Sequence, residues 1–451
     1  MRIKYDHNLR IAGIGLAPWT RLGLERWLKA YKIASLYGWD MKPYAGLPEI
    51  HALTEQYDVH LERQNTQRLL EDSHFQRLLQ DEFLGYSFIT YKAVPIPSAL
   101  DSHRFLTINT DVASRLENKA EFRRLMAAEQ IPFPAYRILA YAELLQESFA
   151  TLSAGREKIV LQDDVLSGGK GTFIVFDQVS FCEAVEALKK YSKGASVVVS
   201  DYIEGARERS VQCVVTRHGI FVGPLQKQII DDPLLSNRAA IAGDKFCGAE
   251  IGADDQWAGI YPEVKKYAER IGELIQNLGY RGIFGLDCLV GPDGKLYILE
   301  VNPRITGVTP LLTMMYRPEE DIPFYLLHVL ELANADYDII DRQVNPKPAV
   351  GGLMMLHSQE LMEVRIAGSV TSGLYDSRDL KLLHSATHFS PDETEARLLV
   401  QQYTPVGVRV KPGGRLLTAF TNTPLLDSND KLLEATQQTV RDLLGSIELS
   451  P

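Results

Sequence analysis

The sequence contains few cysteines. The four that are present, Cys182, Cys213, Cys247 and Cys288, are scattered without the paired spacing of a zinc site. Three of them lie in apolar or β-like surroundings, where a free cysteine usually serves as a small core residue. We therefore expect neither disulfides nor zinc.

The sequence also lacks a surplus of positive charge. Lys and Arg number 48 against 58 Asp and Glu, which gives a net charge of -10. A protein that binds nucleic acid through a broad surface carries the opposite balance. We expect no nucleic-acid partner, and any phosphate site must be confined to a few residues.

Long apolar runs are missing as well. The stretch IAGIGLAPW near the N-terminus is short and interrupted by Gly and Pro, whereas a membrane span needs about 20 apolar residues and a signal peptide needs an unbroken apolar core. We expect no membrane contact and a cytoplasmic location. The ten histidines fall mostly outside the motifs described below, and no Ser-His-Asp or Cys-His arrangement indicates a nucleophilic enzyme.

The chain is long enough for two or three domains. Its 451 residues are 45% hydrophobic, which allows a substantial core. Up to about residue 115, short apolar runs mix with helical stretches, as in a small α/β domain, and no phosphate-loop fingerprint follows them. A helix is expected over 118–130, and strand-like and helix-like segments alternate over 157–335. Residues 335–349 resemble a connection, and the tail adds strands and a terminal helix over 428–447.

Two β-rich runs, 282–290 and 296–302, flank Gly-Pro-Asp-Gly-Lys and predict a hairpin. A loop of two or four residues places Asp287 opposite Glu300 and Leu289 opposite Ile298. One face is then wholly apolar: Leu286, Cys288, Val290, Tyr297, Leu299 and Val301. A three-residue loop, which Pro-Asp-Gly could also form, shifts the register by one and mixes the faces. The apolar face favours the even loop.

In this register two carboxylates face each other, and Asn302 lies on the same face. Like charges directly opposed on a sheet are destabilising, so a positive group is expected beside them. Carboxylate and amide oxygens suit a hard divalent cation better than zinc. The alternative is a solvent-exposed polar face whose repulsion is relieved by nearby Lys or Arg.

A glycine-rich loop, Ser167 to Thr172, lies between two β-rich segments and not between a strand and a helix. The backbone amides of Gly168, Gly169 and Gly171 can approach phosphate oxygens, and Lys170 can add a charge. The alternative is a flexible surface turn.

These motifs, together with Asn118-Lys119, SDYIEGARERS (200–210) and GLD…LEVNPR, resemble the ATP-grasp superfamily of carboxylate-amine and carboxylate-thiol ligases. The resemblance covers about 118–335. It implies an ATP-grasp fold, with an N-terminal α/β domain (1–117), the ATP-grasp domain (118–340) and a C-terminal mixed α/β domain (341–451).

The resemblance also implies roles for individual residues. ATP and Mg²⁺, or Mn²⁺ in its place, are the implied cofactors, and Lys119 would contact phosphate. A second lysine usually stands where this chain has Gln162, and Lys170 could supply the missing charge. The remaining implied assignments are metal ligation by Asp287, Glu300 and Asn302, an adenine hinge at Asp201, Tyr202 and Ile203, and a ribose contact from Glu208.

Two residues are nominated for catalysis by the same resemblance. Arg304 would steady the charge on substrate and transferred phosphate, or alternatively form a salt bridge to one of the carboxylates. Lys227, in a segment similar to a strand of biotin carboxylase, would contact substrate or phosphoryl group, or alternatively be only solvated. The loop 236–252 lies where relatives close over substrate, so Arg238 or Lys245 could meet a carboxylate, unless this is only a mobile surface loop.

The leading functional hypothesis is an ATP-dependent carboxylate-amine ligase that acts on small molecules through an acyl phosphate. The first rival is an enzyme similar to biotin carboxylase that phosphorylates bicarbonate. The second is a nucleotide-binding protein without catalysis. The expected partners are a small carboxylate and an amine, and the resemblance makes a homodimer the oligomer to test.

Overall fold

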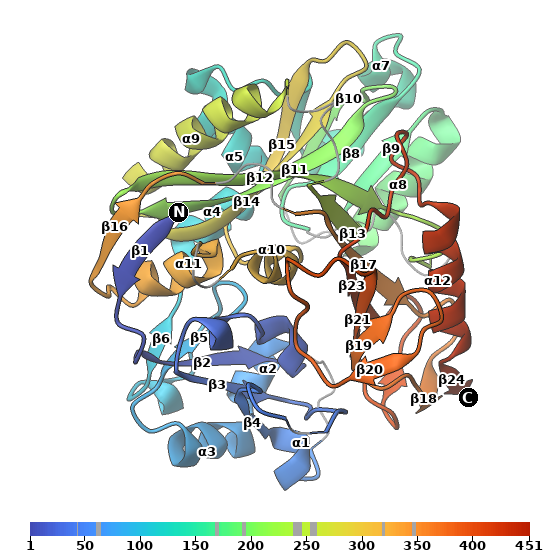
Figure 1. The fold of residues 1–451 in the computed structure, drawn as a ribbon. Coiled ribbons are helices and arrows are strands. Elements are labelled where there is room, and N and C mark those ends of the chain that lie inside the picture. Colours follow the sequence, from blue (N-terminus) through green and yellow to red (C-terminus); the bar gives the residue numbers. More distant parts are fainter. Residues whose placement is uncertain are drawn as a thin grey trace.

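The computed structural model describes residues 1–42, 44–59, 65–166, 171–191, 195–237, 246–252, 259–317, 321–344 and 349–451. Within these residues the strands form five sheets. Figure 1 shows the N-terminal sheet at the bottom, a small sheet at the upper right, and a long sheet that runs from the upper left to the C-terminal part on the right. No helix in these ranges combines the length and apolarity that crossing a bilayer requires.

The N-terminal sheet is parallel and confirms the expected α/β fold of this region. Its strand order is β4-β3-β2-β5-β6, with bounds β2 (Arg10–Gly15), β3 (Ala30–Ser35), β4 (Glu49–Ala52), β5 (Ser87–Ile89) and β6 (Arg104–Leu106). The chain moves outward from β2 to β4 and then returns to add β5 on the other side of β2. Short helices connect the strands: η1 (Pro18–Arg21), η2 (Leu24–Arg26), α1 (Leu53–Gln56), α2 (Thr66–Glu71), α3 (Ser73–Glu82) and η3 (Ser98–Leu100). The strands are all parallel, and the order in which the chain adds them reverses between β2 and β5.

Three short helical elements lead from this sheet to the next one: α4 (Thr110–Glu117), α5 (Lys119–Met126) and η4 (Ala127–Glu129). Asn118 ends α4 and begins α5, because its side chain accepts a hydrogen bond from the amide of Glu121. The small sheet has the antiparallel order β7-β10-β8-β9, with bounds β7 (Tyr136–Ala140), β8 (Ile159–Asp163), β9 (Thr172–Val175) and β10 (Ser196–Asp201). It is accompanied by α6 (Tyr141–Leu144), α7 (Phe149–Ser153) and α8 (Gln178–Tyr191). Phe181, Ala184 and Leu188, on one face of α8, pack into its core.

The long sheet has ten antiparallel strands in the order β15-β14-β11-β12-β13-β17-β23-β21-β19-β20. Their bounds are β11 (Arg207–Thr216), β12 (Gly219–Ile230), β13 (Phe246–Ile251), β14 (Gly282–Val290), β15 (Leu296–Asn302), β17 (Gly351–His357), β19 (Gly373–Asp376), β20 (Leu382–His384), β21 (Arg397–Gln402) and β23 (Arg415–Thr421). Pairing of β13 with β17 carries the sheet across residue 340. The division into 1–117, 118–340 and 341–451 stays a proposal, and the sheet continues across its last boundary.

Helices cover the two faces of this sheet. Phe284 of β14 packs with Val264 and Ile271 of α9 (Tyr261–Asn277), whereas Ile283 packs with Leu326 and other residues of α11 (Phe324–Leu332). Adjacent residues of a strand point to opposite faces, so the two helices lie on opposite sides. The other elements are α10 (Thr309–Met314), α12 (Glu434–Gly445), and the strands of two small sheets, β1 (Arg2–Tyr5) with β16 (Tyr337–Asp341), and β18 (Val364–Gly368) between β22 (Arg409–Val410) and β24 (Glu448–Ser450).

Three segments differ from the expectations. Part of the expected connection 335–349 is strand β16, whose partner β1 lies at the other end of the chain and so leaves no local signal. The end of the expected loop 236–252 is β13, which pairs on both sides and buries Cys247 and Glu250. The terminal helix begins at Glu434 and not near 428, because Asp427 accepts hydrogen bonds from the amides of Asn429 and Lys431 and holds a turn there.

Candidate active site

The hairpin of β14 and β15 brings Asp287 opposite Glu300, as predicted, but by a different route. The loop is the three-residue one: the Gly291 amide donates to the Lys295 carbonyl at 2.9 Å, and Gly294 supplies the positive φ of 78° that this turn needs. The register therefore starts one residue out of step, with Cys288 opposite Ile298. A bulge at Leu299, which has no partner on β14, then shifts the pairing by one residue and brings Asp287 opposite Glu300.

Because of the bulge, the apolar face of the hairpin differs from the predicted one. Between residues 286 and 301 of this hairpin, the buried apolar residues are Leu286, Cys288, Val290, Leu296, Ile298 and Val301. Tyr297 and Leu299, which were predicted to be among them, are only half-buried. The acid pair was predicted correctly but the loop length was wrong, because a single bulge in β15 reverses the alternation of its side chains between the two faces.

The two acids have different surroundings. Both oxygens of Asp287 accept hydrogen bonds from neutral amides, Oδ1 from Gln228 at 3.0 Å and Oδ2 from Asn302 at 2.8 Å. Glu300 has a cation, since Lys119 Nζ lies 3.3 Å from its Oε2. Burial, and next the charge of Glu300, raise the pKa of Asp287 to about 7. Burial also acts on Glu300, but Lys119, with smaller contributions from Arg304 and Arg123, lowers the pKa of this acid.

Arg304 links the acids to the N-terminal region. Its Nη2 donates to Asn302 Oδ1 at 2.8 Å and its Nη1 to the hydroxyl of Tyr91 at 2.9 Å. The salt bridge considered for Arg304 is formed with Glu117, 3.8 Å from its Nε, and not with Asp287 or Glu300 among the pairs within 4.0 Å. Burial disfavours its charge, yet Tyr91 and Glu117 together raise the pKa of Arg304. Arg304 is therefore a fixed cation beside the acid pair.

Lys119 stands at the first turn of α5, which holds a second buried cation. Lys119 Nζ also donates to the Leu166 carbonyl at 2.7 Å, just before the glycine loop. One helical turn later, the fully buried Arg123 donates from Nη2 to Gln162 Oε1 at 3.2 Å and stacks near Phe133 and Tyr136. Its Nε has no hydrogen-bond partner among the described residues. A positive charge thus lies beside Gln162, the position at which the resemblance implies a lysine.

The glycine loop has the strand-turn-strand setting that was expected. β8 and β9 are antiparallel neighbours, and Gln162 pairs with Thr172. Gly171 is needed for close packing, because a Cβ there would lie 2.8 Å from Asp163 Cβ. Gly168, Gly169 and Lys170 lie outside the described residues, as do Arg238 and Lys245.

The expected adenine hinge follows β10. Asp201 ends this strand, its amide donates to the Ala135 carbonyl, and its carboxylate pairs with Arg156 at 2.9 Å. Tyr202 and Ile203 are half-buried, and Tyr202 lies under the ammonium of Lys158. Glu208 pairs with Leu289 in the sheet, two residues from Ser210, which pairs with Asp287. By strand alternation Glu208 lies on the same face as Asp287.

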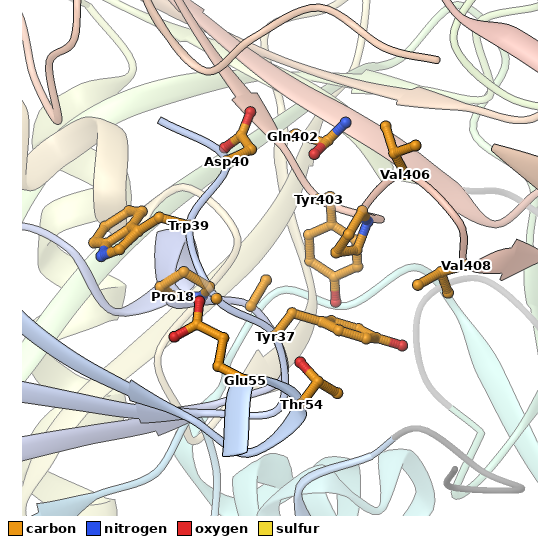
Figure 2. A pocket seen from close by; sticks show the side chains of 13 residues that line it. Pro18, Tyr37, Trp39, Asp40, Thr54, Glu55, Gln402, Tyr403, Val406 and Val408 are labelled. Carbon is orange, nitrogen blue, oxygen red and sulfur yellow. The ribbon is translucent and has the colours of Figure 1, made fainter. Parts of the chain in front are cut away.

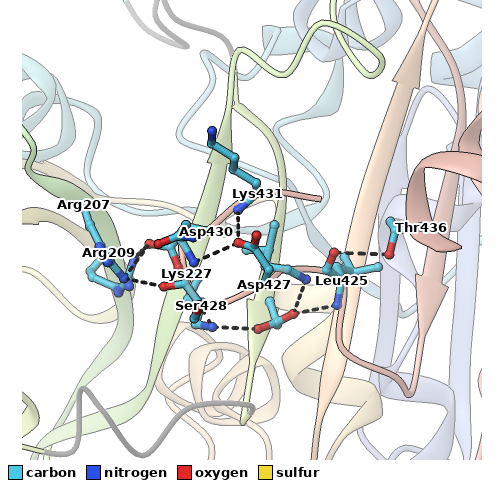
Figure 3. Close-up of polar contacts among 12 residues, drawn as sticks. Arg207, Arg209, Lys227, Leu425, Asp427, Ser428, Asp430, Lys431 and Thr436 are labelled. Carbon is cyan, nitrogen blue, oxygen red and sulfur yellow. Dashed lines mark hydrogen bonds and ion pairs between the residues drawn. The ribbon is translucent and has the colours of Figure 1, made fainter. Parts of the chain in front are cut away.

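Lys227 is not brought to this group. It pairs with Arg209, and Arg209 pairs with Cys288, so Lys227 lies on the face of the sheet opposite to Asp287. There its Nζ is 3.1 Å from Glu250 Oε1 and 4.0 Å from Asp430 Oδ1. Figure 3 shows the chain of contacts that joins Arg209 and Lys227 to residues 425–431. The nomination of Lys227 for substrate contact conflicts with this location.

Comparison with known proteins finds similarity over the part of the chain that contains these residues. The family model of the ATP-grasp domain matches residues 116–308. The [butirosin acyl-carrier protein]--L-glutamate ligase of Niallia circulans is 25% identical over 236 residues, 51% of this chain and 53% of that protein. The chain thus spans about half the length of this curated relative. Two solved structures share the fold: L-amino acid ligase from Bacillus licheniformis (15% identity, TM-score 0.58, 98% and 99% of the two chains) and biotin carboxylase from Campylobacter jejuni (11%, 0.61, 98% and 92%).

Residues 116–308 of the chain are therefore an ATP-grasp domain. The fold of the chain is the ATP-grasp fold with an N-terminal parallel α/β sheet, which extends the match well beyond the family domain. The fold binds ATP with Mg²⁺ in relatives such as the biotin carboxylase domain solved with MgADP.

The donor set of this ATP-grasp domain fits Mg²⁺ held jointly with nucleotide. Among the described residues, no group of three or more His, Cys, Asp or Glu is arranged around a common point. Mg²⁺ is typically held by one or two carboxylates, and phosphate oxygens and water complete its shell. Asp287 and Glu300 meet that requirement. Burial and the charge of Glu300 raise the pKa of Asp287 although the charge of Arg304 lowers it, so a further cation at this point would favour the ionised carboxylate.

Several residues of the site escaped the sequence interpretation. Arg123 could have been found, because it lies one helical turn from Lys119 and on the same face. Gln228 could also have been found by alternation from Gln226, which shares a row with Ser210 and Asp287. Tyr91 and Glu117 carry no motif, and only the fold brings them to Arg304.

Proposed function

We propose that this ATP-grasp protein is an ATP-dependent carboxylate-amine ligase. The substrate carboxylate attacks the γ-phosphorus of ATP, the bond to the bridging oxygen breaks, and ADP leaves. An amine then attacks the acyl carbon of the acyl phosphate, phosphate departs, and the amine nitrogen loses a proton. The products are an amide, ADP and inorganic phosphate.

The observation that carries the proposal is the group formed by Asp287, Glu300, Asn302 and Arg304. Mg²⁺ bound with ATP would neutralise phosphate charge at the two acids. Arg304, held by Asn302 and Tyr91, is fixed next to them and can steady the carboxylate and the phosphoryl group as charge moves between them. A protein that only binds nucleotide has little need for this cation. Positioning and charge neutralisation are what phosphoryl transfer requires.

Other residues fit roles around the nucleotide. Lys119 and Arg123 lie where they can meet phosphate charge, and the backbone of Asp201, Tyr202 and Ile203 is the proposed adenine hinge, with Glu208 directed to the ribose. Gln162 lies on β8 beside Arg123. The names of the relatives support a small carboxylate as substrate, since one is a glutamate ligase and one an L-amino acid ligase.

The rival activity, phosphorylation of bicarbonate, is supported less well. The segment that contains Lys227 resembles a strand of biotin carboxylase, but this lysine lies in an ion-pair network on the face of the sheet opposite to Asp287. A likeness to biotin carboxylase at 11% identity concerns the fold alone.

The test is ADP release with Mg-ATP, screened over amino acids and other small carboxylates, singly and with amines. We expect release that depends on both an organic acid and an amine, and loss of release in Asp287→Asn and Glu300→Gln. Bicarbonate-dependent release without an organic acid would favour the rival. If wild type and both variants bind Mg-ATP alike and none releases ADP, the ligase proposal fails.

A further inference from the structure

A cavity of about 720 Å³ lies beside Arg304. Its walls come from the segments after β2 and β5 in the N-terminal sheet, from the start of α2 and the end of α4, from residues 305–310 after the carboxylate hairpin, and from strands β17, β21 and β23 of the long sheet. β2 and β5 are the neighbouring strands at which the strand order of the parallel sheet reverses. Ligands of such sheets bind outside the carboxyl ends of the strands at this reversal, and the volume is that of a small-molecule site.

One end of the cavity reaches the proposed site of phosphoryl transfer. Ile305, Tyr91 and Glu117 all line it, and Arg304 contacts both Tyr91 and Glu117. A carboxylate in this end would therefore lie close to Arg304. This places the reacting group of a bound substrate, on the proposed function, at the Arg304 end.

The lining is cationic in a chain whose net charge is -10. Arg21, Lys92 and Arg415 line the cavity, and Glu117 is the one carboxylate among the lining residues that the structure describes. Glu117 already faces Arg304. A ligand of this cavity is thus expected to carry more than one negative charge.

Arg415 is the cation of the cavity lining that can bind a second anionic group of a ligand. It belongs to β23, and its guanidinium lies over the ring of Tyr403, 4.6 Å from the centroid, which fixes its orientation. Within the described ranges no carboxylate lies within 4.0 Å of its guanidinium. The planar guanidinium can hold a carboxylate through two parallel hydrogen bonds.

A smaller cavity of about 270 Å³ shares Tyr403 with the first and contrasts with it. Figure 2 shows its acidic side chains, Asp40 and Glu55, together with Tyr37 and Tyr403. Burial raises the pKa of Asp40, whose Oδ1 has no hydrogen-bond partner among the described residues. This neighbouring space repels an anion, so the negative groups of a ligand belong on the Arg415 side of Tyr403.

We infer that the large cavity takes a dicarboxylate: one carboxylate is activated at Arg304, and the second is bound by Arg415. Arg415 is then a specificity-determining residue that selects acids with a second anionic group. The inference rests on the proposed ligase function for the reaction at the first carboxylate. Recognition of the second carboxylate can be measured without any reaction.

The first experiment measures binding by calorimetry, with Mg²⁺ and a non-hydrolysable ATP analogue present. The ligands are L-glutamate, L-aspartate, glutarate and succinate, each paired with its monoamide, which has the same shape and one charge less. We expect wild type to bind at least one diacid more tightly than its monoamide by 10-fold or more. Arg415→Met, which keeps the stem on Tyr403, should weaken diacid binding on the order of 10- to 100-fold and leave monoamide binding unchanged.

Two variants control for folding and for general charge. Arg415→Lys keeps the charge without the planar fork and should give an intermediate loss. Arg409→Met removes an exposed arginine of β22 that does not line the cavity, and should bind diacids as wild type does. All variants are compared by thermal melting first. If no diacid binds more tightly than its monoamide, or if Arg415→Met keeps the preference, the inference is overturned.

ADP release separates this inference from the proposed function. In active protein, Arg415→Met should raise KM for the diacid and leave kcat within about 3-fold, because Arg415 lies away from the reacting carboxylate. Diacid binding that depends on Arg415 without any ADP release would uphold the inference and contradict the ligase proposal. Equal ADP release with diacids and monoamides would do the reverse.

Discussion

The part of the long sheet from β15 to β13 carries charged side chains on both faces, and the two faces balance charge differently. On one face Asp287 and Glu300 meet the ammonium of Lys119, while the hydrogen-bond donors to Asp287 are neutral amides. On the other face Arg209 and Lys227 meet Glu250 and Asp430 at contact distance (Figure 3). Glu250 also accepts hydrogen bonds from the amides of Leu425 and Leu426.

The comparison separates a structural network from a site. The balanced face has a partner for each of its carboxylates, and it ties residues 425–431 to the centre of the sheet. The other face holds two facing acids, and burial together with the charge of Glu300 raises the pKa of Asp287 to about 7. Strongly shifted ionisation at a particular pair indicates function more often than stability. The face where Asp287 accepts only from neutral amides is therefore where Mg²⁺ with ATP is expected.

Removal of Lys227 should give the largest effect on stability. Glu250 is completely buried, so Lys227→Met leaves its charge without a cation and should lower the free energy of unfolding by about 3–5 kcal/mol. Urea denaturation measures this change. The double variant Lys227→Met/Glu250→Gln should recover most of it, because the glutamine oxygen can still accept from Leu425 and Leu426.

The same variant decides between the two interpretations of Lys227. If Lys227→Met keeps the stability of wild type but loses ADP release, the lysine acts on substrate, as the resemblance implied. A stability loss that the double variant repairs, with ADP release restored alongside, assigns it to the network.

The two facing acids should respond to neutralisation with opposite signs. In metal-free protein at pH 8, Asp287→Asn removes a half-buried charge whose hydrogen-bond donors are neutral amides, and should raise the free energy of unfolding by about 1–2 kcal/mol. Glu300→Gln takes the partner from the buried Lys119 and should lower it by about 1–3 kcal/mol. Urea denaturation in EDTA measures both. A shift of the same sign for both variants would contradict the unequal surroundings of the two acids.

Much of the fold was accessible from sequence because periodicity reports local structure. Helix α5 and the hairpin of β14 and β15 were predicted near their observed bounds. The bulge at Leu299 was not, since it depends on which side chains the surrounding core accepts. The pairing of β1 with β16, more than 300 residues away, has no local signal at all.

The site was predicted as far as motifs reach. Lys119, Asp287, Glu300, Asn302 and Arg304 lie together, whereas Lys227 does not. Its nomination rested on a segment that matched a relative, and one residue of register in β12 decides which face a side chain occupies. Tyr91 and Glu117 come from other elements, so only the tertiary structure brings them to Arg304.

Arg123 is expected to contribute a further positive charge to nucleotide binding on the face that carries Asp287 and Glu300. Arg123→Met should weaken binding of Mg²⁺ with a non-hydrolysable ATP analogue by about 10-fold, because a charge beside Gln162 is lost. Adding Gln162→Lys to this variant should restore much of the affinity, since the charge then stands on β8. Calorimetry measures both, after melting has shown that the variants fold.

The matched control for this prediction is Arg124→Met, which removes the exposed neighbouring arginine. It should bind nucleotide as wild type does. Equal losses in the Arg123 and Arg124 variants, or no rescue by Gln162→Lys, would assign Arg123 to packing against Phe133 and Tyr136 alone.

The smallest effect concerns His328, a group buried beside the start of β14 that stays neutral. Its Nδ1 accepts from the Ile283 amide at 3.0 Å, and burial lowers its pKa to about 3. Gly282, at φ 103°, makes room for the ring, since a Cβ there would lie 2.2 Å from Nδ1. The folded pKa is below the unfolded value of about 6.5, so stability is present above pH 6.5 and lost as pH falls toward 3.

His328→Asn keeps an acceptor for Ile283 and removes the titration. Between pH 7 and pH 5.5, wild type should therefore lose about 1 kcal/mol more of its free energy of unfolding than the variant does. Urea denaturation at the two pH values measures the difference. Parallel losses in both proteins would mean that the ring is protonated in the folded state. The sheet would then tolerate a buried positive charge next to Ile283, four residues before Asp287 on β14. The contrast between the two faces would in that case rest on their carboxylates alone.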